Sequence, residues 1–267
     1  MKLYNLFKTV LFFAFIFTYS HRVQAQEKVR TALHDSLYGK VQFHLSNGDI
    51  DSALIVSDLL YRHHTERDDQ MEIVRSRVHK AEILRTIVSL DLAFESLKEV
   101  QKLNESLEPS TVKSYYYNRL GAIEYERKNY EAAIAAVKES QKIDELKNYK
   151  WRIFSNLNIL GAIYRDREQW DKSIEILRKA YEEAKSLDDT AEMYLSLKNL
   201  GMAQYRMGDY RGAINSAKLY SNYDWISYDR MNVSDNFRLV AKAYAELGIM
   251  DSAFMSLDSA HKLNWKR

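Results

Sequence analysis

The tetrapeptides Leu-Gly-Ala-Ile at 120–123, Leu-Gly-Ala-Ile at 160–163 and Leu-Gly-Met-Ala at 200–203 lie 40 residues apart. Continuing the same interval in both directions from their glycines reaches Ala81, Ala241 and Val41. Twelve positions after each of these comes a second small residue, namely Ala53, Ala93, Ala133, Ser173, Ala213 and Ala253. Six units share this frame without insertion or deletion, so five consecutive intervals agree, which predicts six copies of one structural unit.

The two small positions predict a pair of antiparallel helices in each copy. Helices cross closely only where both carry small side chains. Gly48, Gly208 and Gly248 fall between the small positions, where a left-handed residue ends the first helix. A large apolar residue then opens the second helix, at Ile50, Leu90, Tyr130, Trp170, Tyr210 and Met250. The expected fold is all-α, a right-handed α-solenoid of six antiparallel helix hairpins.

The predicted helices and repeats follow from this interval. The helix pairs are expected at 31–46 and 50–64, 71–87 and 90–106, 111–128 and 130–147, 150–167 and 170–187, 190–207 and 210–222, and 233–247 and 250–264. The repeats are expected at 31–70, 71–110, 111–150, 151–190, 191–230 and 231–267.

The first 25 residues have the pattern of a secretion signal. Lys2 and Lys8 precede an apolar run over 10–19, and Val23-Gln24-Ala25 predicts cleavage after Ala25. The run would span about 15 Å as a helix, roughly half of a bilayer core. We therefore expect a repeat domain over 26–267 that is exported, soluble, and periplasmic or extracellular, with no membrane span in the mature chain. Retention of the signal as an anchor is the alternative.

Composition excludes several classes of function. The chain has no cysteine, which excludes disulfides and thiolate metal sites. Loss of Lys2, Lys8 and Arg22 with the signal lowers the formal charge from +2 to −1, which does not suit a nucleic-acid binder. No metal, phosphate-loop or hydrolase motif is present, so we expect no enzyme activity, no metal and no cofactor.

One stretch resembles a known family. Residues 160–164 read Leu-Gly-x-x-Tyr, and Trp170, Ser173, Ile174 and Ala180 follow at the spacing of the tetratricopeptide signature. The preceding unit is similar, at Tyr117, Leu120, Gly121, Tyr130, Ala133 and Ile134. The family's repeat has about 34 residues, so the 40-residue unit would be a longer-helix variant. The resemblance covers roughly 30–265 and implies a scaffold that binds a protein or a peptide in its inner groove. Other helical-hairpin repeats are the competing assignment.

A stripe of polar residues is the predicted peptide-binding site. In a stacked array the first helices line the inner face. Three positions before the small residue these helices carry Asn118, Asn158, Lys198 and Arg238. An amide both donates and accepts, so it could pair with a peptide backbone, and the two cations would favour a carboxylate. The resemblance implies the peptide role for Asn118, Asn158 and Asn199. The alternative is that the stripe is an ordinary solvated helix face.

Neighbouring positions on the same helices complete the predicted site. They add Asn199, Arg165 and Tyr115, whereas Tyr125 is expected in the core. The family's carboxylate clamp for chaperone tails is absent, because Met202 and Leu239 occupy its asparagine positions.

Three alternatives stay open. The chain could be the extracytoplasmic sensor module of a membrane-spanning regulator rather than an adaptor. A second copy could cover the apolar C-terminal edge around Phe254 and Leu257, giving a homodimer. Triplets such as Asp51-Ser52-Ala53 and Asp251-Ser252-Ala253 could accept a sugar, although helix-opening chemistry also explains them.

Overall fold

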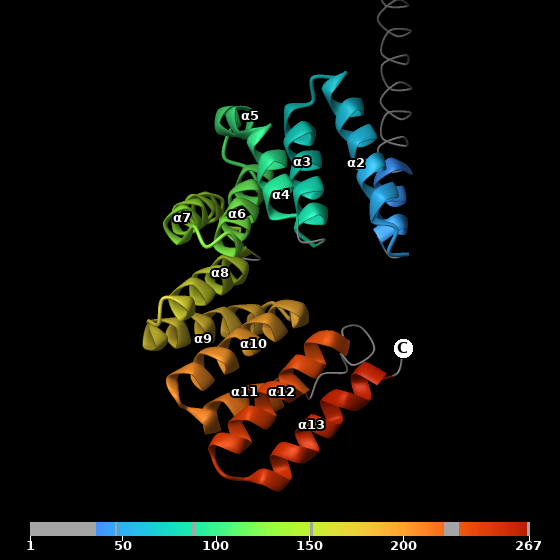
Figure 1. The fold of residues 1–267 in the computed structure, drawn as a ribbon. Helices are drawn as coiled ribbons and strands as arrows, with labels where there is room; N and C mark the ends of the chain where they lie inside the picture. Colours follow the sequence, from blue (N-terminus) through green and yellow to red (C-terminus); the bar gives the residue numbers. More distant parts are fainter. Residues whose placement is uncertain (1–35, 46, 87–88, 150–151, 222–229, 266–267) are drawn as a thin grey trace, which may run out of the picture. The chain divides into compact units, whose positions relative to one another are not determined.

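A computed structural model describes residues 36–45, 47–86, 89–149, 152–221 and 230–265 (Figure 1). Within these ranges the regular elements are helices and there is no strand, which confirms the all-α prediction. Residues 36–45 are helical. The later helices are α2 (Ile50–Thr65), α3 (Gln70–Thr86), α4 (Leu90–Lys98), α5 (Gln101–Ser106), α6 (Thr111–Glu126), α7 (Tyr130–Lys147), α8 (Ile153–Asp166), α9 (Trp170–Ser186), α10 (Thr190–Met207), α11 (Tyr210–Ser221), α12 (Arg230–Glu246) and α13 (Met250–Trp265).

The chain forms two compact units, Met1–Asn104 and Glu105–Arg267. In the first unit α2 packs on α3, and α3 packs on α4. In the second unit the hairpins α6–α7, α8–α9, α10–α11 and α12–α13 follow one another, and each is in contact with the next (Figure 1).

The 40-residue interval is visible in the helix boundaries. The second helices of the six hairpins begin at Ile50, Leu90, Tyr130, Trp170, Tyr210 and Met250, as predicted. Residues with a left-handed backbone precede five of these starts by two positions, at Gly48, Lys128, Glu168, Gly208 and Gly248. Lys128 and Glu168 hold positive φ angles of 67° and 59° without the freedom of glycine. The turn therefore has one geometry, which the chain keeps even where its sequence changes.

The small residues meet where the two helices of a hairpin cross. A Cβ atom added to Gly121 would lie 3.3 Å from the Ala133 carbonyl oxygen, and one added to Gly201 would lie 3.5 Å from that of Ala213. In the third such hairpin the Ser173 hydroxyl donates a 2.7 Å hydrogen bond to the Gly161 carbonyl. These three contacts confirm the predicted crossing points.

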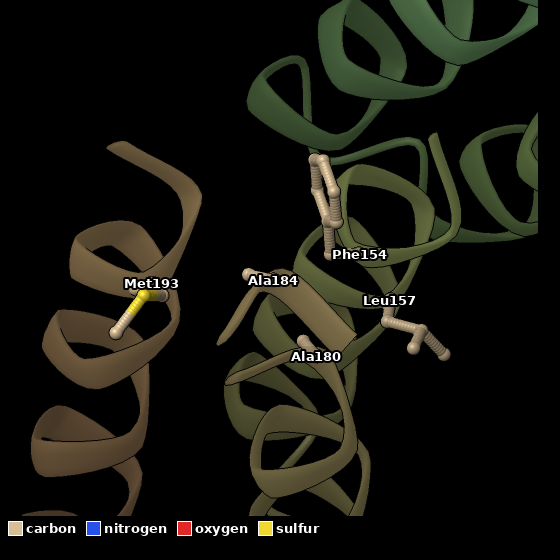
Figure 2. Close-up of a cluster of buried hydrophobic side chains, with 5 residues drawn as sticks. All are labelled: Phe154, Leu157, Ala180, Ala184 and Met193. Atoms are coloured by element: carbon tan, nitrogen blue, oxygen red, sulfur yellow. The ribbon is translucent and has the colours of Figure 1, made fainter. Parts of the chain in front are cut away.

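Successive hairpins are joined by apolar clusters. In one of them Phe154 and Leu157 of α8 meet Ala180 and Ala184 of α9 and Met193 of α10 (Figure 2). All five side chains are buried. The first helix of one repeat thus packs into the hairpin before it, as a stacked array requires.

Three predicted helices differ from the structure by three residues or more, and one of them, expected from residue 233, begins at Arg230. The single helix expected over 90–106 is divided into α4 and α5, because the Val100 N–H bonds to the Leu97 carbonyl three residues back, which tightens the turn. The helix expected from residue 150 begins at Ile153, because α7 ends in a left-handed Asn148 and the Tyr149 N–H bonds back to Asp144.

The predicted signal over 1–25 and the start of the first helix lie outside the described residues. Among those that are described, no helix is both long and apolar enough to cross a membrane.

The crossing points give a prediction about stability. A Cβ atom at Gly161 would lie 2.5 Å from Leu177 Cγ, a branch point that is fully buried, whereas one at Gly39 would meet nothing within 4 Å. Gly161→Ala should lower the free energy of unfolding by about 2 kcal/mol through overpacking. Gly39→Ala should raise it by up to about 1 kcal/mol through helix propensity. Urea denaturation followed by circular dichroism measures both, and equal stability of the two variants would contradict the crossing geometry.

Candidate protein-binding surface

The first helices of the second unit lie next to one another in the order α6, α8, α10, α12, and each contacts the next (Figure 1). This is the face on which the peptide site was predicted. Polar side chains bridge from helix to helix along it, and their bonds decide which groups remain available to a partner.

Asn118 lies inside the contact between α6 and α8. Its side chain is fully buried, and its Nδ2 donates to Asn156 Oδ1 at 2.8 Å and to Ser155 Oγ at 3.2 Å. Its Oδ1 accepts a 2.9 Å bond from Arg119 Nε. Both the nitrogen and the oxygen of the Asn118 amide are therefore bonded within the protein. The Arg119 guanidinium, which bonds to the Asn118 oxygen, also lies 3.4 Å from Ser155 Oγ of α8.

Asn158 occupies the equivalent place between α8 and α10. It is 3% exposed, and its Nδ2 donates to Glu192 Oε2 at 3.1 Å. Its Oδ1 accepts no hydrogen bond from the described residues. Burial raises the pKa of Glu192 above its ordinary value, although the Asn158 bond acts in the opposite direction. The amide thus holds a half-buried carboxyl group in place.

Tyr115 lies at the start of this face, among cations. The guanidinium carbons of Arg119 and Arg152 lie 5.2 and 5.3 Å from the centre of its ring, within the range of cation–π attraction. Arg152 is buried and donates a 2.7 Å bond to the Thr111 carbonyl. Burial lowers its pKa to about 10, so it stays charged at neutral pH.

Arg165 is the centre of a second network, which joins three first helices. It donates to the Tyr125 hydroxyl at 2.8 Å, to Asp166 Oδ1 at 3.0 Å and to Asn199 Oδ1 at 3.2 Å. The Tyr125 hydroxyl in turn donates to Asp166 Oδ2 at 3.0 Å. Burial raises the pKa of Asp166, but Arg165 and Tyr125 outweigh it and hold that pKa below its ordinary value. The guanidinium is therefore fixed in position.

A cavity of about 460 Å³ opens beside this network. Trp170, Tyr130 and Met202 supply its apolar wall. The charged lining comes from Arg165, Lys128, Arg206, Asp166 and Glu168. The residues belong to α10, to the end of α8 and to the turns that lead into α7 and α9. The cavity can therefore accept an apolar side chain with a charged group beside it.

The remaining predicted residues lie further along the face. Lys198 and Asn199 are half-buried on α10, and Arg238 is exposed on α12 with a 3.2 Å ion pair to Asp235. Of the predicted residues, Arg165 alone lines the cavity. Asn199 does not line it, but it accepts a hydrogen bond from Arg165.

Sequence reasoning missed the other cavity residues and the role of Tyr125 in the network beside the cavity. Tyr125, expected in the core, is half-buried and forms part of the network instead. Lys128 and Glu168 recur 40 residues apart in the turns, as do Tyr130 and Trp170. Alignment of the turns, rather than of the first helices alone, would have found these four residues.

The burial of Asn118 gives a prediction that separates a structural amide from a solvated one. Asn118→Ala should lower the free energy of unfolding by about 2 kcal/mol, because it leaves buried partners unpaired. Arg238→Ala removes an exposed i,i+3 pair and should change it by less than about 0.5 kcal/mol. Chemical denaturation of both variants measures the difference. If Asn118→Ala were as mild as Arg238→Ala, the amide would not hold α6 and α8 together.

Comparison with known proteins supports the repeat assignment. The tetratricopeptide repeat family model matches residues 152–220, which span α8 to α11. No curated protein sequence matches the chain. The model match falls on the repeats in which the tetratricopeptide signature was seen.

Solved structures show the same fold over most of the chain. BtubC (BKLC) from P. vanneervenii aligns over 85% of this chain and 91% of its own, with a TM-score of 0.64 and 16% identity. Pseudomonas aeruginosa pilF aligns over 89% and 95%, with a TM-score of 0.60 and 15% identity. A putative kinesin light chain of Podosopora anserina, described as having TPR-like repeats, aligns over 72% and 95%, with a TM-score of 0.56 and 14% identity. The chain thus has a tetratricopeptide-like fold, and residues 152–220 match the family itself.

Proposed function

We propose that this protein is an exported, non-catalytic scaffold that binds a segment of another protein, and that the cavity between α8 and α10 anchors that segment. The tetratricopeptide-like fold supports the general role, because helical-repeat arrays offer extended surfaces to partners. The cavity supports the specific place.

The observation that carries the proposal is the chemistry of the cavity wall. Trp170, Tyr130 and Met202 offer the aromatic and thioether surfaces that recur at protein contact sites. Three cations face two anions, so the lining has a net charge of +1. The volume falls within the range of about 300–1,000 Å³ typical of ligand sites. A peptide with a large apolar side chain next to an acidic one fits these properties.

The three cations do not contribute equally to binding. Arg165 already has three partners and serves as a fixed wall. Arg206 is exposed, and Lys128 is an exposed side chain 3.5 Å from Asp166. Exposed cations can turn toward an incoming carboxylate at little cost, so Arg206 and Lys128 are the groups expected to select an acidic segment.

The cavity predicts the outcome of a peptide selection. A random peptide library displayed on phage and selected on the purified protein should be enriched in sequences that pair an apolar residue with an acidic one. The double change Lys128→Glu and Arg206→Glu should weaken binding of a selected peptide by at least about tenfold, since two attractive contacts become repulsive. Fluorescence anisotropy of the labelled peptide measures the change in Kd.

The matched control is Lys142→Glu, which reverses one exposed charge on α7 away from the cavity. It should leave the Kd unchanged, and circular dichroism should show both variants folded. Selected peptides that bind the double variant as tightly as the unchanged protein would remove the cavity from the proposal.

Export is a separate part of the proposal, and it is supported by the pattern of the first 25 residues. When the full sequence is expressed in a bacterium with a periplasm, the mature protein is expected to begin at Gln26. Intact-mass spectrometry of the envelope and cytoplasmic fractions measures this. Uncut protein confined to the cytoplasm would contradict export and would leave the cavity proposal untouched.

A further inference from the structure

The last described helix carries an exposed apolar stripe whose equivalents in the other repeats are buried or half-buried. Met250, Phe254 and Leu257 lie four and three positions apart on α13, which places them on one face of the helix. Their exposed fractions are 54%, 71% and 49%. We call these three residues the α13 stripe.

Equivalent residues in the preceding repeats lie under the next hairpin. Leu177, 80 positions before Leu257, is fully buried against Leu200 and Ala203 of α10. Ile214 and Ala217, 40 positions before Phe254 and Leu257, are 6% and 1% exposed and pack on Val240 and Ala243 of α12. On the second helices of these earlier repeats, the positions equivalent to the α13 stripe therefore pack against the first helix of the following repeat.

The helix at 36–45 carries the complementary surface. Phe43 is 64% exposed. Its equivalents at intervals of 40 include Ile83, Ala203 and Ala243, which are at most 5% exposed. The last two pack on the second helix of the preceding repeat. Phe43 thus stands at the position with which a first helix contacts the repeat before it.

Charged residues beside these two surfaces match as well. Where α2 meets α3, Lys80 Nζ lies 2.8 Å from Asp58 Oδ1. Counting by 40 residues places Asp258 at the position of Asp58 and Lys40 at that of Lys80. In the intervening repeats the Asp58 position holds Lys98, Lys138, Arg178 and Lys218, and the Lys80 position holds Leu120, Leu160, Leu200 and Val240. Asp258 on α13 and Lys40 on the helix at 36–45 would therefore form the same pair that Asp58 and Lys80 form within the chain.

We propose that two copies of this chain associate head to tail, with the α13 stripe of one copy packed against the 36–45 helix of the next. The contact continues the interface that already joins repeats within the chain, with Phe43 on Phe254 and Leu257 and with Lys40 paired to Asp258. Asp258 now pairs with Lys262 on its own helix, an exposed i,i+4 contact that exchanges at little cost. Because the two surfaces differ, the association is heterologous and can extend beyond two copies.

Charge exchange tests the orientation of the pair. The protein is expressed from its full sequence, purified as the cell delivers it, and studied by sedimentation velocity over a range of concentrations. Lys40→Asp alone and Asp258→Lys alone should each weaken self-association by about tenfold, because each places like charges across the junction. An equal mixture of the two variants should associate as the unchanged protein does, since each junction between unlike copies again joins Lys to Asp.

Several outcomes would overturn the proposal. A chain that stays monomeric at every concentration would do so, and so would a mixture that fails to restore association. A tail-to-tail dimer through α13 would respond to Phe254→Glu but not to Phe43→Glu, whereas head-to-tail association should be lost with either. Leu146→Glu is the control, because it changes a residue of α7 that is 69% exposed and lies outside the stripe positions. It should leave association unchanged, and circular dichroism should show all variants folded.

Discussion

The close crossing of two helices at a pair of small residues is the constraint on which the rest of the structure depends. Gly161 has no room for a methyl group against Leu177, and the Ser173 hydroxyl bonds to its carbonyl. Such a contact tolerates no slippage, because moving one helix by a residue would bring a larger side chain to the crossing. Each hairpin is therefore held in one register, and the same positions return to the same environments every 40 residues.

Because of this register, polar side chains of the first helices form hydrogen bonds to the next first helix within the protein. Asn118 and Asn158 lie three positions before the crossing and reach the next first helix, where they are buried in bonds to Asn156 and Glu192. Lys128 and Glu168, in the turns that lead into α7 and α9, line the cavity together with Trp170 of α9 and Arg206 of α10. Packing thus engages the amides of Asn118 and Asn158 within the protein, whereas the cavity lining includes the exposed side chains of Lys128 and Arg206.

A structural feature could be predicted from the sequence when the residues that determine it lie close together in the chain. The start of each second helix was predictable because it depends on a turn and an apolar residue a few positions apart. The burial of Asn118 was not, because it depends on the angle at which α6 and α8 pack, and a single repeat does not contain that angle. The break between α4 and α5 has no glycine or proline to mark it. The left-handed backbone at Lys128 and Glu168 could not be predicted either, because neither residue type favours that conformation.

The same repetition bears on how the exposed α13 stripe would select its partner. Within a chain, the linker between repeats keeps the effective concentration of the next hairpin high, so the internal interface can be mostly apolar. Two separate copies lack that linker, and a face like Phe254 and Leu257 alone would accept many apolar surfaces. The charged residues beside the apolar surfaces reduce the number of second helices that the helix at 36–45 can pair with. Lys40 would meet a lysine or arginine on any second helix from Lys98 to Lys218, and an aspartate at position 58 or 258. Because Asp58 is already held by Lys80 and Arg77, Asp258 is left as the matching position.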